Sequence, residues 1–518
     1  MTLRFFVTLS SLALLLAGCA PRAAQPLATT PASGPSIATP TQRDRWLEMF
    51  ARGYFPGRSG QVFYVLRQGD FLWDKNPLYA FMHGSPWPYD TRIPLLLHGA
   101  PFIRQGLFTG AARQQDVAPT FAALLGTTPP PTATGRVLSE ALAPSTSRPR
   151  VVALFVLDGM RADYFDLYKD VMPTLTRLRA EGASFPNAQV DYIPTLTSVG
   201  HATLGTGTDP RIHGLVVNNL FNRVTNKSQE SYDRLNPQEL MALTLADTWN
   251  IATDGRAVII GQGGAIRATA GLVGRGACLI NGRKVIAASY AAVESGAWET
   301  NGDCYTMSDA LKPLNARRYW ENAGGSWMGH DISTASRFRN SSLFQRYEGD
   351  ALVAILEREA IGADDITDMV MVNLKGPDYV GHAYGPQSPE IKETLAELDR
   401  QMARALATLQ QKAGANQVVV AITADHGMPG EPAAGARRLI MADIVNAVHD
   451  RFDAKGRTVV QYFGDPANSQ FHLDTARLQT LGFSLKDVAT FLEGQLFTAA
   501  FTEDEVRAAQ VRLAAQRP

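Results

Sequence analysis

Residues 191–219, DYIPTLTSVGHATLGTGTDPRIHGLVVNN, decide the fold and the chemistry that we expect of this chain. Pro194 fixes the backbone ahead of Thr197, and a short glycine-rich apolar segment follows at residues 199–204. We therefore predict that Thr197 lies where a strand turns into a helix, with its hydroxyl at the helix start. Free N–H groups and the positive end of the helix dipole favour a phosphate or an alkoxide there. The simpler alternative is that Thr197 is only the N-cap of that helix.

A threonine hydroxyl is a poor nucleophile unless a base or a metal ion lowers its pKa, so a catalytic role for Thr197 requires metal ligands elsewhere in the chain. Residues 151–157 are a continuous apolar, β-branched run, and residues 368–374 and 417–423 are mainly apolar; such runs are typical of buried parallel strands. Carboxylates and imidazoles, the ordinary ligands of zinc, follow each run. They are Asp158 after the first run, Asp378 and His382 after the second, and Asp425 and His426 after the third.

The alternation of these strands with helices predicts an α/β fold. A helix is expected at residues 173–181, and a longer one begins at Ser388 and Pro389 and ends at Gly414. This order indicates a doubly wound, mostly parallel sheet with helices on both faces. Ligands bind at the carboxyl ends of the strands in such sheets. Two metal ions there would hold both the attacking and the leaving oxygen of an in-line displacement. The alternative for the D-x-x-x-H spacing of Asp378 and His382, taken alone, is a pair of residues on the protein surface.

Composition limits the classes of function. The chain has 518 residues, with Lys+Arg and Asp+Glu both at 49 and a net charge of zero, so we expect no nucleic-acid partner. We predict a single catalytic domain over residues 45–518, with a cap insertion at about residues 265–345 that is rich in Gly, Asn and Trp. Cys278 and Cys304 are expected either to pair in an oxidising compartment or to remain two buried thiols.

The N-terminus has the pattern of a targeting segment. Arg4 precedes an apolar run that is too short to span a membrane, and Leu16-Ala17-Gly18-Cys19 follows it. LAGC resembles the bacterial lipoprotein processing site, which implies a signal peptide at residues 1–18 and a lipid on Cys19. An ordinary signal peptide is the alternative. Residues 19–44 are expected to form a flexible tether, and the protein to face the periplasm, anchored to the outer membrane.

Four motifs together carry a resemblance to a known superfamily. VLDGMRADYF, PTLTSVGHATLGTGTDPRIHGLVVNN, GPDYVGHAYGP and TADHG look like the alkaline phosphatase superfamily. They are most similar to its threonine-nucleophile branch, the phosphate-irrepressible alkaline phosphatases and the nucleotide pyrophosphatase/phosphodiesterases.

The resemblance implies two zinc ions and a set of residues that contact phosphate. One zinc would be bound by Asp158, Thr197, Asp425 and His426, and the other by Asp378, His382 and one more histidine. Asn218 and the backbone N–H of Ser198 would donate to a phosphate oxygen. The implied reaction has two steps, attack by Thr197 on phosphorus and hydrolysis of the resulting phosphothreonine.

The chain departs from the family in the position of the last histidine. In the family this residue lies after the D-H-G motif, where the only candidate here is His472. The block that resembles the family's final segment lies instead at residues 45–145. We therefore predict a circular permutation with His83 as the third ligand, and we expect residues near Arg52 to lie close to the end of the chain. His472 is the alternative.

The second departure concerns the substrate. Monoesterases of this branch carry a Lys-x-Arg motif; Arg267 matches its arginine, but Ala265 stands where its lysine would be. Arg275 and Lys284 are possible substitutes. We expect a phosphomonoesterase, with a phosphodiesterase or nucleotide pyrophosphatase as the alternative. A sulfatase would need a C/S-x-P-x-R motif, which TSVGH is not. A catalytically inactive ligand-binding lipoprotein on the same fold is the alternative of another class.

Overall fold

The computed structural model describes residues 38–275, 278, 285–290, 294–430 and 436–515. The signal peptide and Cys19 lie outside these residues. The last residues of the expected tether do not form a linker, because helix α1 (Pro40–Gly53) begins within it and is capped by Thr39. Among the described residues, no helix has both the length and the apolar character that crossing a membrane requires.

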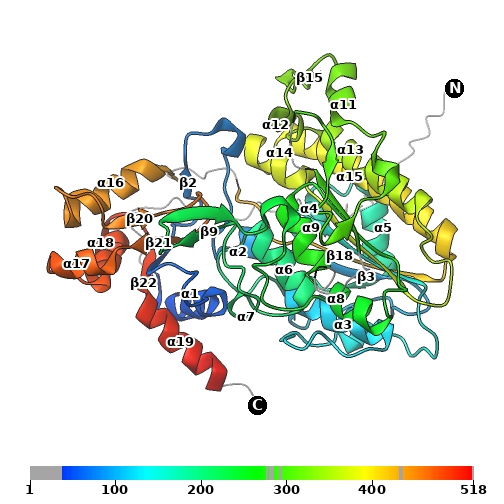
Figure 1. The fold of residues 1–518 in the computed structure, drawn as a ribbon, viewed down its shortest axis with the longest axis horizontal. Helices are drawn as coiled ribbons and strands as arrows, with labels where there is room; N and C mark the ends of the chain where they lie inside the picture. The colour runs from blue at the N-terminus through cyan, green and yellow to red at the C-terminus, as the bar shows by residue number, and fades with distance from the viewer. Residues whose placement is uncertain (1–37, 276–277, 279–284, 291–293, 431–435, 516–518) are drawn as a thin grey trace, which may run out of the picture.

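A ten-stranded, mostly parallel sheet forms the centre of the described part of the chain (Figure 1). Its central strands β11, β17, β6 and β18 run parallel to one another, and β3 pairs with β18 in the antiparallel direction. Every residue of β6, β17 and β18 is buried, so both faces of the sheet are covered. The strands, in spatial order, are β13 (Trp298–Glu299), β12 (Val285–Tyr290), β11 (Ile259–Gly263), β17 (Asp368–Leu374), β6 (Val151–Leu157), β18 (Val418–Thr423), β3 (Leu95–His98), β7 (Ala183–Ser184) and β4 (Gly106–Leu107), with β14 (Tyr305–Thr306) beside β12.

Two groups of helices pack on this sheet. In one group α6 contacts α3, α8 and α9, and in the other α15 contacts α5, α13 and α14. The expected doubly wound α/β class is therefore confirmed. The helices of these groups are α3 (Val117–Leu125), α6 (Thr197–Thr206), α8 (Leu245–Ala252) and α9 (Ile266–Val273), and α5 (Pro173–Glu181), α13 (Ser342–Arg358), α14 (Gly376–Tyr384) and α15 (Pro389–Ala413).

A second, four-stranded sheet joins the front of the chain to its far end. Strand β1 lies between β21 and β22, antiparallel to both. α1 packs against α19, and the Gln510 side chain donates to the carbonyl oxygens of Ala51 and Tyr54 at 3.0 and 2.9 Å. The expected proximity of the Arg52 region to the end of the chain is thus confirmed. This lobe, seen on the left in Figure 1, contains β1 (Val62–Val65), β20 (Val460–Tyr462), β21 (Gln470–Leu473), β22 (Ala499–Thr502), α16 (Met441–Phe452), α17 (Thr475–Thr480), α18 (Leu485–Gln495) and α19 (Glu503–Ala515).

The predicted cap at residues 265–345 includes part of the main fold. Its first helix, α9, packs on the central sheet, and β12 is a strand of that sheet. The remainder, with α11, α12 and β15, lies at one end of the molecule, at the top of Figure 1. Cys278 and Cys304 are joined by a disulfide. The cap elements outside the sheet are α11 (Ala316–Asn322), α12 (Ala335–Phe338), β15 (Ser326–Trp327) and β16 (His330–Asp331).

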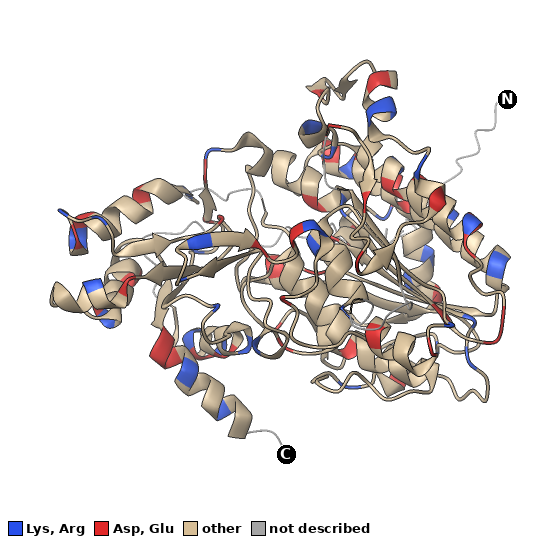
Figure 2. Cartoon of the chain, viewed as in Figure 1, with Lys and Arg blue, Asp and Glu red and all other residues tan. Residues whose placement is uncertain are grey.

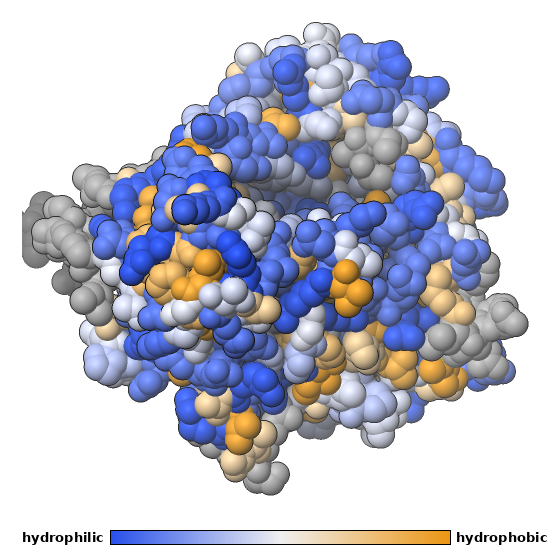
Figure 3. All heavy atoms as spheres, turned by 60° about the vertical axis from the view of Figure 1, so that its left-hand side comes forward, coloured by the Kyte–Doolittle hydropathy of each residue, from blue (hydrophilic) through white to orange (hydrophobic). Residues whose placement is uncertain are grey.

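Short elements complete the described chain. They are α2 (Pro88–Thr91), α4 (Tyr164–Leu167), α7 (Pro210–His213) and the strand pairs β2 (Phe71–Trp73) with β19 (Arg438–Ile440), β5 (Ala112–Arg113) with β8 (Ala188–Gln189), and β9 (Asn219–Asn222) with β10 (Lys227–Glu230). Figure 2 shows Lys and Arg interspersed with Asp and Glu over the whole fold. The face in Figure 3 is mostly hydrophilic, with apolar groups in small separate patches.

Candidate active site

The carboxyl ends of neighbouring strands bring the candidate metal ligands to one edge of the central sheet. β17, β6 and β18 lie side by side in this order and run parallel. Asp158 follows β6 directly, Asp425 follows β18 after one residue, and Asp378 lies in the first turn of α14 just after β17. All three carboxylates are buried. Charged groups held away from water in this way need close partners of opposite charge.

Thr197 is the first residue of α6, and it faces these carboxylates. The N-cap is Leu196, in extended conformation, so the alternative in which Thr197 serves as the N-cap is wrong. The hydroxyl is therefore not used to cap its own helix, and it is only 2% exposed. α6 lies directly against Asp425: a Cβ added to Gly200 would come within 2.6 Å of the Asp425 Cβ. The absence of a side chain at Gly200 is what allows this close approach.

The buried carboxylates and histidines form two adjoining groups. In the first, His426 Nε2 lies 3.6 Å from Asp158 Oδ1 and 3.2 Å from Asp425 Oδ2. In the second, Asp378 Oδ1 lies 3.2 Å from His382 Nε2 and 3.6 Å from His83 Nε2. The rings of His83 and His426 stack with centroids 3.6 Å apart, so the two groups share a border. The structure thus brings together all seven residues that the sequence proposes as metal ligands.

The three histidines are oriented alike. Each donates its Nδ1–H to a backbone carbonyl: His83 to Thr195 at 2.7 Å, His382 to Phe81 at 2.6 Å, and His426 to Gly427 at 2.8 Å. Each ring therefore turns its Nε2 toward the carboxylates. Backbone acceptors of this kind fix the tautomer and the orientation of metal-binding histidines.

These residues fit a bound metal. Asp378 Oδ1, Asp425 Oδ2 and His426 Nε2 are buried and have no hydrogen-bond partner within the described part of the chain. Burial lowers the pKa of His426, and burial together with His426 and His382 lowers that of His83 well below its ordinary value. Both imidazoles are thus neutral with a lone pair at Nε2. Neutral imidazoles mixed with carboxylates are the ligand set that zinc prefers.

A lysine that sequence reasoning did not assign lies between the two groups. Lys375 Nζ is 2.7 Å from Asp158 Oδ1, 2.6 Å from Asp378 Oδ2 and 2.9 Å from Thr197 Oγ1. Burial alone would lower its pKa, but Asp158, Asp378 and Asp425 raise it, so the amine carries a positive charge. The sequence signal that could have indicated Lys375 is its position directly after residues 368–374, the same predicted strand from which Asp378 was inferred.

Asn373 and His201, which the sequence analysis also did not assign, connect Asp158 to the backbone of Thr197 through hydrogen bonds. Asn373 Nδ2 donates to Asp158 Oδ2 at 2.8 Å and to His201 Nε2 at 2.9 Å. His201 Nδ1 in turn donates to the backbone carbonyl of Thr197 at 2.8 Å, and burial lowers the pKa of His201 to about 4. This chain of bonds fixes Asp158 relative to the first turn of α6. The only sequence signal was an asparagine inside the otherwise apolar run of residues 368–374.

The residues expected to contact phosphate are placed differently from one another. Asn218 follows α6 and the short helix α7, and its Oδ1 accepts from the backbone N–H of Ser198 at 3.1 Å. That N–H, expected to be free for phosphate, is occupied by Asn218, which leaves the Asn218 Nδ2 as the donor. Arg267 lies in α9, where its Nε is buried with no hydrogen-bond partner among the described residues. Its charge interacts with Tyr379, Tyr79, Glu230 and Asp465, and Ala265 is the N-cap of α9.

His83 and His472, the two candidates for the last ligand, lie in different places. His83 joins the metal-binding groups, whereas His472 lies in β21, with its ring 5.0 Å from Phe221 and 5.7 Å from Tyr462. Neither ring nitrogen of His472 has a partner in the residues that the structure describes. The structure therefore does not bring His472 to the candidate site.

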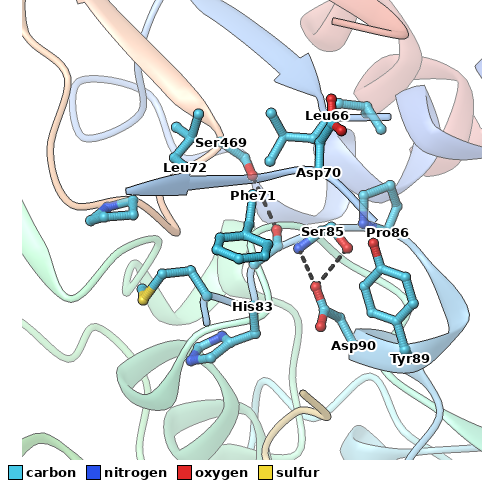
Figure 4. A pocket seen from close by; sticks show the side chains of 14 residues that line it. Leu66, Asp70, Phe71, Leu72, His83, Ser85, Pro86, Tyr89, Asp90 and Ser469 are labelled. Carbon is cyan, nitrogen blue, oxygen red and sulfur yellow. Dashed lines mark hydrogen bonds between the residues drawn. The ribbon is translucent and has the colours of Figure 1, made fainter. Parts of the chain in front are cut away.

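The loop that carries His83 is fixed by a hydrogen-bonded turn beside a small pocket (Figure 4). The backbone N–H and hydroxyl of Ser85 donate to Asp90 Oδ2 at 2.8 and 2.6 Å. The Ser469 hydroxyl, from the far end of the chain, donates to the carbonyl of Gly84 at 3.0 Å. Burial raises the pKa of Asp90 to about 7. The turn at Ser85 and the contact from Ser469 together fix the loop that carries His83.

Comparison with known proteins identifies relatives of this chain. Residues 152–508 match the family model described as Type I phosphodiesterase / nucleotide pyrophosphatase. Over 327 residues the chain is 29% identical to alkaline phosphatase PafA of Elizabethkingia meningoseptica, covering 54% of this chain and 60% of that protein. It is 25% identical over 283 residues to ectonucleotide pyrophosphatase/phosphodiesterase family member 3 of Mus musculus, covering 54% of this chain and 25% of that protein.

A solved structure shares the fold. The crystal structure of wild-type alkaline phosphatase PafA superimposes with a TM-score of 0.56 at 22% identity, covering 68% of this chain and 77% of that one. The chain spans about 60% of the length of the first bacterial relatives that it matches.

Proposed function

Because this chain belongs to the type I phosphodiesterase / nucleotide pyrophosphatase family, we propose that it is a zinc-dependent hydrolase of small phosphate esters that acts through a phosphothreonine on Thr197. The family match confirms the alkaline phosphatase superfamily that the motifs predicted. One observation supports the proposal most strongly. The Thr197 hydroxyl lies at a buried helix start beside two adjoining groups of carboxylates and imidazoles.

Each group suits one zinc ion. Asp158, Thr197, Asp425 and His426 would hold one, and Asp378, His382 and His83 the other. Bound there, the ions would act as Lewis acids that lower the pKa of the Thr197 hydroxyl and stabilise negative charge on the leaving oxygen.

The chain's own residues orient the reacting groups. Thr197 Oγ attacks phosphorus, and the bond from phosphorus to the leaving oxygen breaks with its electron pair. Asn218 Nδ2 donates to an oxygen of the phosphoryl group. A water molecule then displaces Thr197 Oγ from phosphorus, which releases orthophosphate and restores the hydroxyl. Preorganised donors of this kind contribute most in surroundings of low dielectric constant, and Asp158, Thr197 and Asp378 are buried.

The front segment would complete the second zinc site. We propose that residues 45–145 are the circularly permuted counterpart of the family's final segment. The position of His83 and the contact between α1 and α19 support this. The lipoprotein anchor at Cys19 and the periplasmic location also belong to the proposal, and they rest on the sequence pattern at residues 1–19 alone.

Turnover of a nitrophenyl phosphate monoester against the matching diester tests the proposed function. The zinc-loaded full chain should hydrolyse the monoester faster, and Thr197→Ala should abolish turnover even at an excess of zinc that keeps both sites filled. Faster diester turnover would favour the phosphodiesterase alternative, for which Ala265 is the supporting observation. Full activity in Thr197→Ala would contradict the nucleophile assignment. Failure to bind zinc, with no turnover of either ester, would favour an inactive binding protein.

A further inference from the structure

We propose that Lys375 is a catalytic residue, whose ammonium group binds the nucleophile Thr197 and the transferred phosphoryl group and thereby favours dianionic phosphate monoesters. The inference rests on the proposed function and deepens it, since it names a residue that selects the substrate class. The observation that leads to it is a direct contact. The ammonium donates to Thr197 Oγ1 over 2.9 Å, so it touches the atom that would form the new bond to phosphorus.

The position of this ammonium group is fixed by its surroundings. Lys375 is 1% exposed, and its backbone N–H donates to both carboxylate oxygens of Glu348, at 3.0 and 3.1 Å. It is the N-cap of α14, directly after β17, so its backbone is held between a strand and a helix. A donor held in this way loses little conformational entropy when an anion binds.

A purely structural ion pair would not require the contact with Thr197. The ammonium group has three N–H donors, and two of them reach Asp158 and Asp378, one from each metal-binding group. The third is directed at the nucleophile. An oxygen of a phosphoryl group bonded to Thr197 Oγ would lie within reach of the same ammonium, because that oxygen and Oγ are attached to one phosphorus atom.

The charge balance favours a dianion. With two divalent ions bound, Asp158, Asp378 and Asp425 would be more than neutralised, and Lys375 adds a further positive charge at the point of reaction. Two arginines lie near the same tyrosine: Arg339 Cζ is 4.7 Å from the centre of the Tyr379 ring, and the positive charge of Arg267 opposes the rise that burial gives to the pKa of the Tyr379 hydroxyl. Lys375 Nζ is 5.3 Å from the same ring centre. A monoester carries one more negative charge than a diester and gains more from these positive charges.

The lysine keeps its protons throughout the reaction. The Thr197 hydroxyl proton passes to solvent, Oγ forms its bond to phosphorus, and the leaving oxygen departs with the electron pair and takes a proton. Negative charge thus moves from Oγ to the phosphoryl group and the leaving oxygen. Lys375 donates a hydrogen bond to Thr197 Oγ before the attack and to an oxygen of the phosphoryl group after it. In the hydrolytic step it stabilises Oγ as that atom leaves phosphorus.

The test compares Lys375→Met with a matched surface control. Lys392→Met removes an exposed lysine that pairs with Asp170, so it tests for unspecific effects of losing one charge. Lys375→Met should lower kcat/KM for the nitrophenyl monoester by about 10²–10³-fold, as loss of one preorganised donor does, and lower that for the diester far less. Zinc content should remain unchanged. Lys392→Met should behave as the wild type.

Two further measurements test the role of Lys375 even if Lys375→Met folds poorly or the wild type hydrolyses neither ester. Ethylammonium should restore part of the monoester activity of Lys375→Ala, which a structural role would not allow. Calorimetry should show that the zinc-loaded wild type binds orthophosphate roughly tenfold or more tightly than Lys375→Met.

The inference would be overturned by loss of zinc from Lys375→Met, by an equal loss for both esters, by absence of rescue, or by equal orthophosphate affinities. A wild type that hydrolyses esters beside an unaffected Lys375→Met would refute the inference while the proposed function stands. A wild type that binds orthophosphate through Lys375 but hydrolyses neither ester would refute the function and leave the anion contact intact.

Discussion

Replacing His83 by alanine should weaken one of the two metal sites and leave the other in place. His83 Nε2 lies 3.6 Å from Asp378 Oδ1. In the sequence His83 is far from the D-H-G motif that supplies His426. The change removes one of three side chains from the group that contains Asp378 and His382. Asp158, Asp425 and His426 remain in place, and His426 loses only the ring of His83 that stacks on it at 3.6 Å, so one zinc ion should still bind with an affinity close to that of the wild type.

The expected size of the effect follows from the coordination. Removing a residue that merely orients a ligand costs about 10–100-fold in metal affinity, so losing a ligand itself should raise Kd by at least about 100-fold. This corresponds to ~2.7 kcal/mol of binding free energy. At saturating zinc the stabilisation that zinc gives to the fold should shrink by the same amount.

The assay is a competition titration with a chromophoric chelator, combined with thermal unfolding with and without zinc. Unfolding of the metal-free variant separates the loss of packing on His426 from the loss of the metal. His472→Phe is the matched control, since His472 is also a buried histidine and is the alternative ligand from the sequence. Two wild-type affinities in His83→Ala, or loss of one site in His472→Phe, would refute the assignment.

Three further predictions concern packing, the disulfide and pH. Gly200→Ala should destabilise the fold by about 1–3 kcal/mol and lower kcat, because its Cβ would meet the Asp425 Cβ at 2.6 Å; an unchanged melting temperature and rate would contradict this. Reducing the Cys278–Cys304 bond, which spans 26 residues, should cost about 3.5 kcal/mol of unfolding free energy, measured by urea titration with and without reductant against the Cys278→Ser/Cys304→Ser variant. Burial lowers the pKa of His472 to about 3, so the folded state resists its protonation and stability is lost as pH falls from about 6.5 toward 3. His472→Phe should therefore gain ~2 kcal/mol over the wild type at pH 5 relative to pH 8, and parallel stability curves would contradict this.

Local sequence signals predicted the main strands and helices well. Residues 151–157 and 368–374 form β6 and β17 as expected, because short, mainly apolar runs that contain β-branched residues favour a buried strand. α15 begins after Ser388 and ends at Gly414, where the capping residues indicated. The candidate ligands followed from these strands, since parallel strands place their carboxyl ends at one edge.

Other features depend on contacts between distant residues. The four-stranded sheet joins β1 to β21 and β22, and nothing in the residues around 62 indicates which strands they meet. Lys375 and Asn373 stood at a strand end like Asp378, but no metal-ligand pattern marked them. The predicted cap starts too early, because residues 266–273 form α9, which packs tightly against α6: a Cβ on Gly271 would meet the Ala202 nitrogen at 2.9 Å.

The most direct test of the account is a search for phosphate on Thr197 during turnover. The zinc-loaded protein would be mixed with a nitrophenyl phosphate monoester, quenched in acid within the first turnovers, digested and analysed by mass spectrometry. We predict that the peptide containing Thr197 gains the mass of one phosphoryl group in the wild type and not in Thr197→Ala. Hydrolysis of the monoester by the wild type, with rapid quenching at several times and no phosphate on that peptide, would contradict the central claim.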